Sequence, residues 1–221
     1  MTIKKNDFIE IDYTGKFADD NQVFDTTKES VAKENDFFNE QEKDKFKPMI
    51  ICVGQRHVIE GLDEAFVGKK EGENFSIEIK KKQGFGNKDP KKIQLVSLAQ
   101  FRKQNINPMP GMPVNFDDEY GVIRTVSGGR VIVDFNHPFS GKDLIYDVSI
   151  NKIITDESEK TKLLLKSMFG IDSDVKINEK KADIALKLPA NVKKESFNEQ
   201  ILQIIKDKIK EIIGLEANIK V

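Results

Sequence analysis

Within the first ninety residues, apolar and polar side chains alternate in two segments, as they do in β-strands. The alternation covers 9–13 and 75–79, which predicts two half-buried strands. A continuous apolar run at 49–53 is typical of a fully buried strand. Within 59–68 the apolar residues follow helical spacing up to a glycine, so we expect a short amphipathic helix there. The charged stretch 28–47 has no clear period and indicates a long, partly helical surface excursion.

The pattern changes near residue 88. A short strand at 93–96 and a helix at 97–104, capped by Ser97, are expected first. The four prolines or glycines that follow within 108–113 exclude a helix interior there. Gly128-Gly129 then marks a hairpin. Three apolar segments predict the strands of this second, β-rich module: 114–116, 122–126 and 131–135.

A third pattern begins after Thr155. A helix is expected over 157–169, and Gly170 is expected to end it. Alternation at 184–188 predicts a strand. Six isoleucines within 201–213 share one helical face, as core or dimer contacts do. With a short final strand near the C-terminus, the segment has the order α-β-β-α-β.

Composition narrows the function classes. The 221 residues carry a net charge of −1, and only four of the 36 basic residues are arginine. Because specific phosphate and base recognition relies on the arginine guanidinium, a dedicated nucleic-acid binder is disfavoured. The single cysteine, Cys52, is expected to be a core thiol and fits a reducing compartment. The sequence offers no membrane helix and no signal peptide, so we expect a soluble, cytoplasmic protein.

Covalent and metal catalysis are both disfavoured. His57, His137 and Cys52 are the only typical zinc ligands, too few for a tetrahedral site without carboxylates. Both histidines are therefore expected to be structural, and no cofactor or metal is expected. Pocket-forming side chains and one acid remain: Phe24-Asp25 at a strand end and Phe85 between two glycines.

Several motifs resemble one known family. Residues 53–63 read VGQRHVIEGLD and resemble the signature of the FKBP-type peptidyl-prolyl cis-trans isomerases. Tyr13, the segment 23–25 and the segment 84–86 occur in that family's order. Residues 133–142 read VDFNHPFSGK and are similar to the hallmark of the SlyD-like branch, in which a chaperone domain is inserted in the flap. With its C-terminal extension, the whole chain resembles the long archaeal type.

The resemblance implies an α+β fold. An FKBP-like antiparallel sheet would wrap on a short helix, with an inserted β-rich domain in the flap and a C-terminal α+β domain. The isomerase domain is then discontinuous and comprises 1–87 and 141–154. The inserted chaperone domain comprises 88–140, and the C-terminal domain comprises 155–221.

The resemblance also implies a proline pocket. Its catalytic residues would be Asp25, Tyr13, Phe85 and Tyr146. Its substrate-binding residues would be Phe24, Met49, Val58, Ile59 and Leu62. Asp25 would lie at the mouth near the twisting amide, and the backbone N–H of Ile59 would hold a substrate carbonyl.

Two positions depart from the family's pattern. Leu62 stands where the pocket floor is often Trp, which predicts a shallower and looser floor. Phe85 stands where the flap aromatic is often Tyr, so it has no hydroxyl to donate to a substrate carbonyl. Weaker binding of tight small-molecule ligands is expected, with activity retained. The His-rich tail of nickel-binding branches is missing from this sequence.

The expected function is that of a peptidyl-prolyl cis-trans isomerase and folding chaperone. Its partners would be unfolded or proline-containing polypeptides, with a homodimer through 155–221 and with neither nucleic acid nor membrane as a partner. Two alternatives stay open: a holdase with little isomerase activity, and an RNA-contacting module that uses Lys180-Lys181 and Lys193-Lys194. Apolar side chains of the insertion are expected to offer the chaperone surface: Met109, Met112, Phe116, Phe135 and Phe139.

Overall fold

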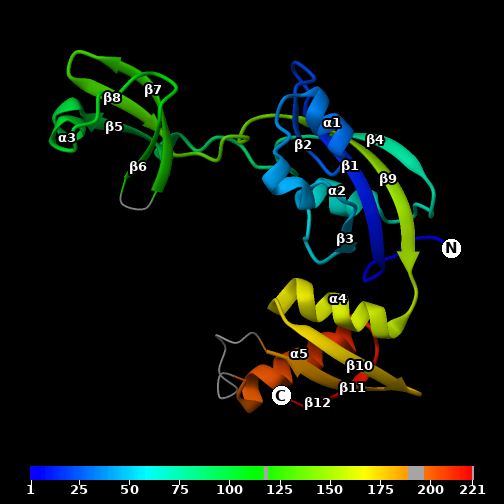
Figure 1. The fold of residues 1–221 in the computed structure, drawn as a ribbon. Helices are drawn as coiled ribbons and strands as arrows, with labels where there is room; N and C mark the ends of the chain where they lie inside the picture. Colours follow the sequence, from blue (N-terminus) through cyan, green and yellow to red (C-terminus); the bar gives the residue numbers. More distant parts are fainter. Residues whose placement is uncertain (117–118, 189–196, 221) are drawn as a thin grey trace. The chain divides into compact units, whose positions relative to one another are not determined.

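The computed structural model of the chain describes residues 1–116, 119–188 and 197–220. The chain folds into two compact units (Figure 1). The first consists of Met1–Lys16, Asn21–Ile77 and Ile145–Val221, and the second of Phe17–Asp20 and Glu78–Leu144. The division into isomerase, inserted and C-terminal domains stays a prediction.

A five-stranded sheet forms the N-terminal part, in the order β2-β1-β9-β4, with β3 paired to β1 off this path. Its strands are β1 (Phe8–Phe17), β2 (Val23–Thr26), β3 (Met49–Cys52), β4 (Asn74–Ile79) and β9 (Leu144–Ile154). The long β1 pairs antiparallel with β3 through its first half and with β2 through its second. This arrangement brings Asp25 opposite Gly15 and Met49 opposite Ile11.

Two connections complete this part. The charged excursion folds into α1 (Glu29–Glu34) and a 3₁₀ helix (Glu40–Lys45), as its lack of period predicted. The short helix α2 (Glu60–Ala65) buries Leu62, and Phe66 at its C-cap is fully buried. Asp63 of α2 accepts hydrogen bonds from the backbone N–H groups of Gly54 (2.8 Å) and Arg56 (3.1 Å). These bonds fix the turn that leads from β3 into the helix.

A separate four-stranded antiparallel sheet lies within 93–134, in the order β5-β8-β7-β6. Its elements are a 3₁₀ helix (Pro90–Lys92), β5 (Ile93–Ser97), α3 (Leu98–Lys103), β6 (Pro113–Phe116), β7 (Glu119–Ser127) and β8 (Arg130–Asp134). Ser97 and Gln100 form a capping box at the start of α3, which confirms the predicted cap. Phe101 of α3 is buried against Val114, Ile123, Val131 and Val133.

The apolar residues expected to offer the chaperone surface are less exposed than predicted. Met112, Phe116 and Phe135 are half-buried and pack against the core of this sheet. Phe116 lies two residues after the buried Val114, and residues two apart in a strand share a face. Met109 alone of the expected residues is strongly exposed.

The C-terminal part follows the predicted order α-β-β-α-β. Its elements are α4 (Glu157–Phe169), β10 (Asp172–Asn178), β11 (Lys181–Lys187), α5 (Glu199–Ile212) and β12 (Glu216–Lys220). β10 and β11 form an antiparallel hairpin, and β12 returns parallel to β11. Ile205, Ile209 and Ile212 of α5 are buried, whereas Ile204 is 53% exposed. Ile204 therefore lies on the part of the isoleucine face that the core leaves uncovered.

Some predicted features lie outside the described residues, among them Lys193-Lys194 and Val221. Of the helices within 1–116, 119–188 and 197–220, none has the length and apolar composition needed to cross a membrane.

Candidate active site

A cleft of about 860 Å³ opens beside the paired strands β1 and β2 in the first unit. Among the predicted site residues it is lined by Tyr13, Phe24, Asp25 and Met49. Phe37 and Phe46 of the excursion also line it. The volume falls within the range of small-ligand sites, roughly 300–1,000 Å³. The lining thus places aromatic side chains beside the Asp25 carboxylate of β2.

The hydroxyl of Tyr13 donates a hydrogen bond of 2.7 Å to Oδ2 of Asp25. Burial of the ring raises the pKa of Tyr13, and the hydrogen bond to the Asp25 carboxylate raises it further. Tyr13 therefore stays protonated and keeps the donor. The backbone of Tyr13 is held as well, because its N–H donates to Oγ1 of Thr27 (3.0 Å) and its carbonyl accepts from Oγ1 of Thr26 (2.8 Å).

Tyr146 of β9 joins the two aromatic residues of the cleft. Its ring centroid lies 5.8 Å from that of Tyr13 and 5.9 Å from that of Phe24, the latter edge to face. Tyr146 is buried. Its burial raises its pKa most, and the nearby Asp25 charge raises the pKa further. Edge-to-face and tilted pairs add roughly 0.5–1.5 kcal/mol beyond their area burial. The three rings therefore form a preorganised wall.

Gly15 makes this wall possible, and sequence reasoning missed it. A Cβ atom at Gly15 would lie 2.7 Å from Cζ of Phe24 and 3.2 Å from Cε1 of Tyr146. Only a residue without a side chain leaves room for the two rings over β1. A glycine inside an alternating strand is the available signal, since it often marks a close approach.

Phe37 and Phe46 were also missed. Their ring centroids are 6.3 Å apart, and Phe38 packs on Phe46 at 5.5 Å. The ammonium of Lys33 lies 4.6 Å from the Phe38 ring centroid. The excursion thus carries its own small aromatic cluster, which no periodicity in the sequence reveals.

The remaining predicted residues lie elsewhere. Leu62 is in the core at 1% exposure. Val58 and Ile59 are half-buried in the turn before α2, and Ile59 is the N-cap of that helix with extended backbone. Phe85 belongs to the second unit, where its ring stacks on that of His137. Their roles in substrate binding stay predictions.

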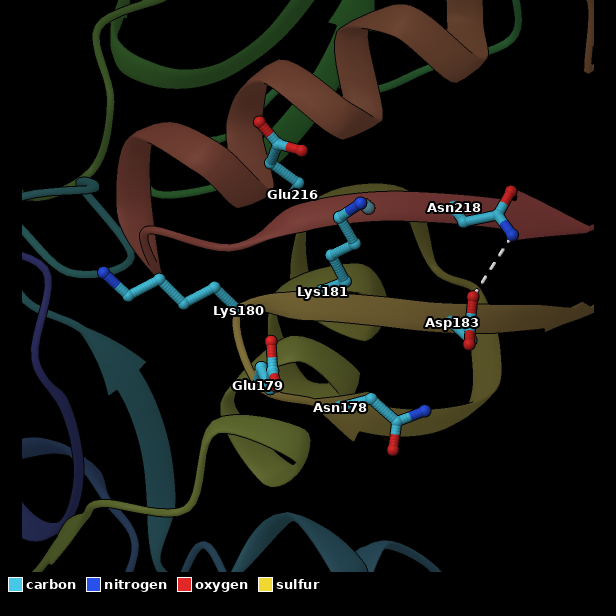
Figure 2. A pocket seen from close by; sticks show the side chains of 8 residues that line it. Asn178, Glu179, Lys180, Lys181, Asp183, Glu216 and Asn218 are labelled. Atoms are coloured by element: carbon cyan, nitrogen blue, oxygen red, sulfur yellow. Dashed lines mark hydrogen bonds between the residues drawn. The ribbon is translucent and has the colours of Figure 1, made fainter.

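A second depression, of about 850 Å³, lies in the C-terminal part. Figure 2 shows its polar lining, with the amide of Asn218 directed at Asp183, to which it donates at 3.1 Å. Lys181 lies opposite Glu216 in the register of the strands β11 and β12. Lys180 is the other cation here, against three acids in the lining, Glu179 among them. Mixed charges of this kind do not form a phosphate site.

Neither depression holds a set of metal ligands. Across the described ranges of the chain, no group of three or more histidine, cysteine or acidic side chains is placed to bind a metal ion. Cys52 is buried, and burial raises the pKa of its thiol to about 12.

Comparison with known proteins assigns the family. Residues 1–102 match the family described as FKBP-type peptidyl-prolyl cis-trans isomerase, and residues 94–139 match the domain described as FKBP26, IF domain. The chain is 32% identical over 157 residues to the short-type peptidyl-prolyl cis-trans isomerase of Methanocaldococcus jannaschii, across 71% of this chain and 98% of that protein. The chain belongs to the FKBP family.

Bacterial members of the family are similar over a smaller part of this FKBP. The FKBP-type 16 kDa peptidyl-prolyl cis-trans isomerase of Escherichia coli K12 is 29% identical over 119 residues, 52% of this chain and 79% of that protein. The isomerase SlyD of Haemophilus influenzae is 28% identical over 109 residues, 47% of this chain and 56% of that protein. The predicted enzyme class, an FKBP-type peptidyl-prolyl cis-trans isomerase, and the α+β fold with antiparallel sheets are confirmed.

Proposed function

We propose that this isomerase twists X-Pro bonds in the cleft lined by Tyr13, Phe24 and Asp25. The observation that carries the proposal is the 2.7 Å hydrogen bond from Tyr13 to Asp25 within a wall of three aromatic rings. It fixes the only carboxylate of the predicted site against apolar surface. Met49 lines the same cleft. By the family resemblance, Val58, Ile59, Leu62 and Phe85 are proposed to contact substrate as well.

The chemistry requires no bond to the enzyme. Rotation about an amide bond crosses a barrier of ~18–20 kcal/mol because resonance is lost, and uncatalysed X-Pro exchange takes tens to hundreds of seconds or so. The twisted state has a less polar carbonyl and a more pyramidal nitrogen. Aromatic surface stabilises that state more than the planar one, which is catalysis by differential binding. A thousandfold acceleration needs only about 4 kcal/mol.

Asp25→Ala tests this assignment. We expect kcat/KM for a proline tetrapeptide to fall about tenfold or more, since hydrogen bonds to charged groups contribute roughly 1.5–3 kcal/mol. Exchange is measured by NMR line shape, without a coupled protease. Asp25→Asn keeps an acceptor for Tyr13 and separates charge from hydrogen bonding, while Asp183→Ala is the matched acid outside the cleft. An unchanged rate in Asp25→Ala removes Asp25 from the mechanism.

The chaperone role rests on a different surface. Large apolar side chains of the four-stranded sheet are exposed, with Leu95 at 63% and Tyr120 at 57% exposure. Leu95 pairs across strands with Ile132, and Ile93 is exposed on the same edge strand, β5. Exposed apolar patches of this kind mark interaction sites. Polypeptides held there reach the prolyl cleft at raised effective concentration.

Leu95→Glu combined with Ile93→Glu tests the chaperone role. We expect unchanged turnover of a tetrapeptide and a marked slowing of proline-limited refolding of a whole protein. Val67→Glu, an equally conspicuous apolar residue (54% exposed) outside that sheet, is the control. Equal loss in both assays contradicts this division of labour. Normal suppression of aggregation with no isomerase activity in the unmodified chain favours the holdase alternative instead.

Two further proposals concern assembly and location. Ile204, exposed on α5, is proposed to join two copies through 155–221. Sedimentation of Ile204→Glu at several concentrations tests this, and a mass identical to that of the unmodified chain at every concentration ends the idea. A reducing compartment, the cytoplasm, is the proposed location because the only thiol of the chain is free and buried. Polypeptides, and neither nucleic acid nor membrane, are the proposed partners.

A further inference from the structure

The turn that carries Phe85 has little stiffness of its own. Phe85 lies between Gly84 and Gly86, and Gly86 has a positive φ of 78°. The turn is closed by backbone hydrogen bonds from Gly84 to Lys80 (3.1 Å) and from Gly86 to Lys81 (2.7 Å). Glycines on both sides leave the backbone free to change conformation. The orientation of the Phe85 ring must therefore be set by contacts from other segments.

Those contacts come from residues 137–141. The ring of His137 lies parallel to that of Phe85, with centroids 4.4 Å apart and an interplanar angle of 4°. Phe139 meets the Phe85 ring edge to face at 5.2 Å. The backbone is held as well, because Oγ of Ser140 donates to the Phe85 carbonyl (3.1 Å) and the Gly141 N–H donates to the Gly86 carbonyl (2.8 Å).

His137 is itself fixed. Its Nδ1 accepts a hydrogen bond from the Phe139 N–H at 3.2 Å, and its ring lies 5.4 Å from the Phe139 ring. The preceding residue, Asn136, is buried and exchanges two hydrogen bonds with Asp89, one in each direction, at 2.8 and 3.0 Å. The imidazole thus projects from a hydrogen-bonded segment onto the side chain of Phe85.

The exposure of His137 sharpens the question of its role. An exposed imidazole is ordinarily solvated on both faces, whereas this one covers one face of a half-buried phenyl ring. Phe85 lacks the hydroxyl that the family's usual tyrosine has, so a hydrogen bond from its own ring cannot hold it. Ring stacking is the remaining directional restraint on its side chain.

We propose that His137 is a positioning residue for the isomerase reaction. Its stacked ring holds the Phe85 ring in the orientation that contacts substrate, and Phe139 closes the ring's edge. The inference rests on the proposed function through the assignment of Phe85 to the proline pocket. In this proposal His137, near the C-terminal end of the predicted 88–140 insertion, orients Phe85, which lies just before that insertion.

The experiment compares four variants of the full chain: His137→Ala, His137→Phe, His137→Asn and Phe85→Ala. His137→Phe keeps a stacking ring and loses the acceptor for the Phe139 N–H, while His137→Asn keeps an acceptor and loses the ring. We expect His137→Ala and His137→Asn to lower kcat/KM for a proline tetrapeptide by about threefold to tenfold, the range that an aromatic pair can supply. His137→Phe is expected to restore it.

A spectroscopic readout separates positioning from general damage. The ring-proton shifts of Phe85 carry the ring current of its neighbour, so they should change in His137→Ala and stay close to the original in His137→Phe. Equal rates in His137→Phe and His137→Ala overturn the proposal, and so does full activity of Phe85→Ala. These failures leave the proposed function standing, since that fails only when the unmodified chain or Asp25→Ala gives the contrary result.

Discussion

Two depressions of nearly equal volume, about 860 and 850 Å³, both carry acidic and basic side chains, but only the first is also lined by aromatic rings. One gathers aromatic rings around the Asp25 carboxylate, which Tyr13 fixes. The other, on the sheet of the C-terminal part, is lined by amides and by charges of both signs, such as Lys181 and Asp183. Volume does not distinguish them. We place the proposed reaction in the first because the Asp25 carboxylate is held there against aromatic rings, an environment that suits a twisting, uncharged amide.

Gly15→Val should break the first depression most severely. The added side chain would meet the Phe24 ring, which lies 2.7 Å from an ideal Cβ at this position. We expect kcat/KM to fall about tenfold to a hundredfold, corresponding to the roughly 1–3 kcal/mol that overpacking costs. Ala217→Val, in the second depression, is the matched control. A variant that folds and turns over normally shows that the ring wall is not needed.

Tyr13→Phe has the next largest expected effect. It removes the donor to Asp25 while keeping the ring, so we expect kcat/KM to fall about threefold to tenfold. In the folded chain the pKa of Tyr13 is raised above its ordinary value of about 10. The folded state therefore disfavours the phenolate, and stability should fall as pH rises above about 10. In urea titrations, the free energy of unfolding of Tyr13→Phe should fall less steeply with pH than that of the unmodified chain. Identical pH profiles of the two proteins would contradict a raised pKa of Tyr13.

Phe37→Ala tests whether the excursion contributes to the site. Loss of one ring from the Phe37–Phe46 pair should lower kcat/KM about twofold to threefold for peptides with a large apolar residue beside proline. Peptides with alanine at that position should be unaffected. Phe75→Ala removes another half-buried phenylalanine, one that packs on Phe66, and controls for stability. The same loss with both peptides argues against direct contact with substrate.

Charge reversal in the second depression has the smallest expected effect. Lys180→Glu combined with Lys181→Glu should leave kcat/KM unchanged within about twofold. Binding of a short RNA, followed by fluorescence anisotropy at low salt, should be weak in the unmodified chain, because neighbouring acids offset the two lysines. Tight, salt-sensitive RNA binding that this variant abolishes restores the RNA-contacting alternative.

The sequence predicted most of the local elements and the family, because alternation and caps are written in neighbouring residues. Ser97 caps α3 where expected, and β11 alternates, with Ile184 and Leu186 buried. Exposure was predicted less well, because an apolar residue in a strand fits both the core and a binding surface. Phe116 is apolar whether it faces core or client, and only its spacing from Val114 distinguishes the two.

The site was less predictable than the strands around it. The contact between Tyr13 and Asp25 depends on the register of β1 against β2, which shifts after Gly15. The aromatic residues Phe37 and Phe46 belong to a segment without period, so their meeting is a tertiary result. His137 and Phe85 are 52 residues apart in the chain, and no local rule relates them.

The two hydrogen bonds between Asp89 and Asn136 have an architectural consequence. They bring the beginning and the end of a whole folded sheet side by side, within reach of one amide group. A folded sheet whose two ends lie together in this way can be inserted in a single loop without separating the strands on either side of that loop, as tolerated insertions require. Replacement of the sheet would therefore require matching one short junction, while the strands outside 89–136 keep their own pairing.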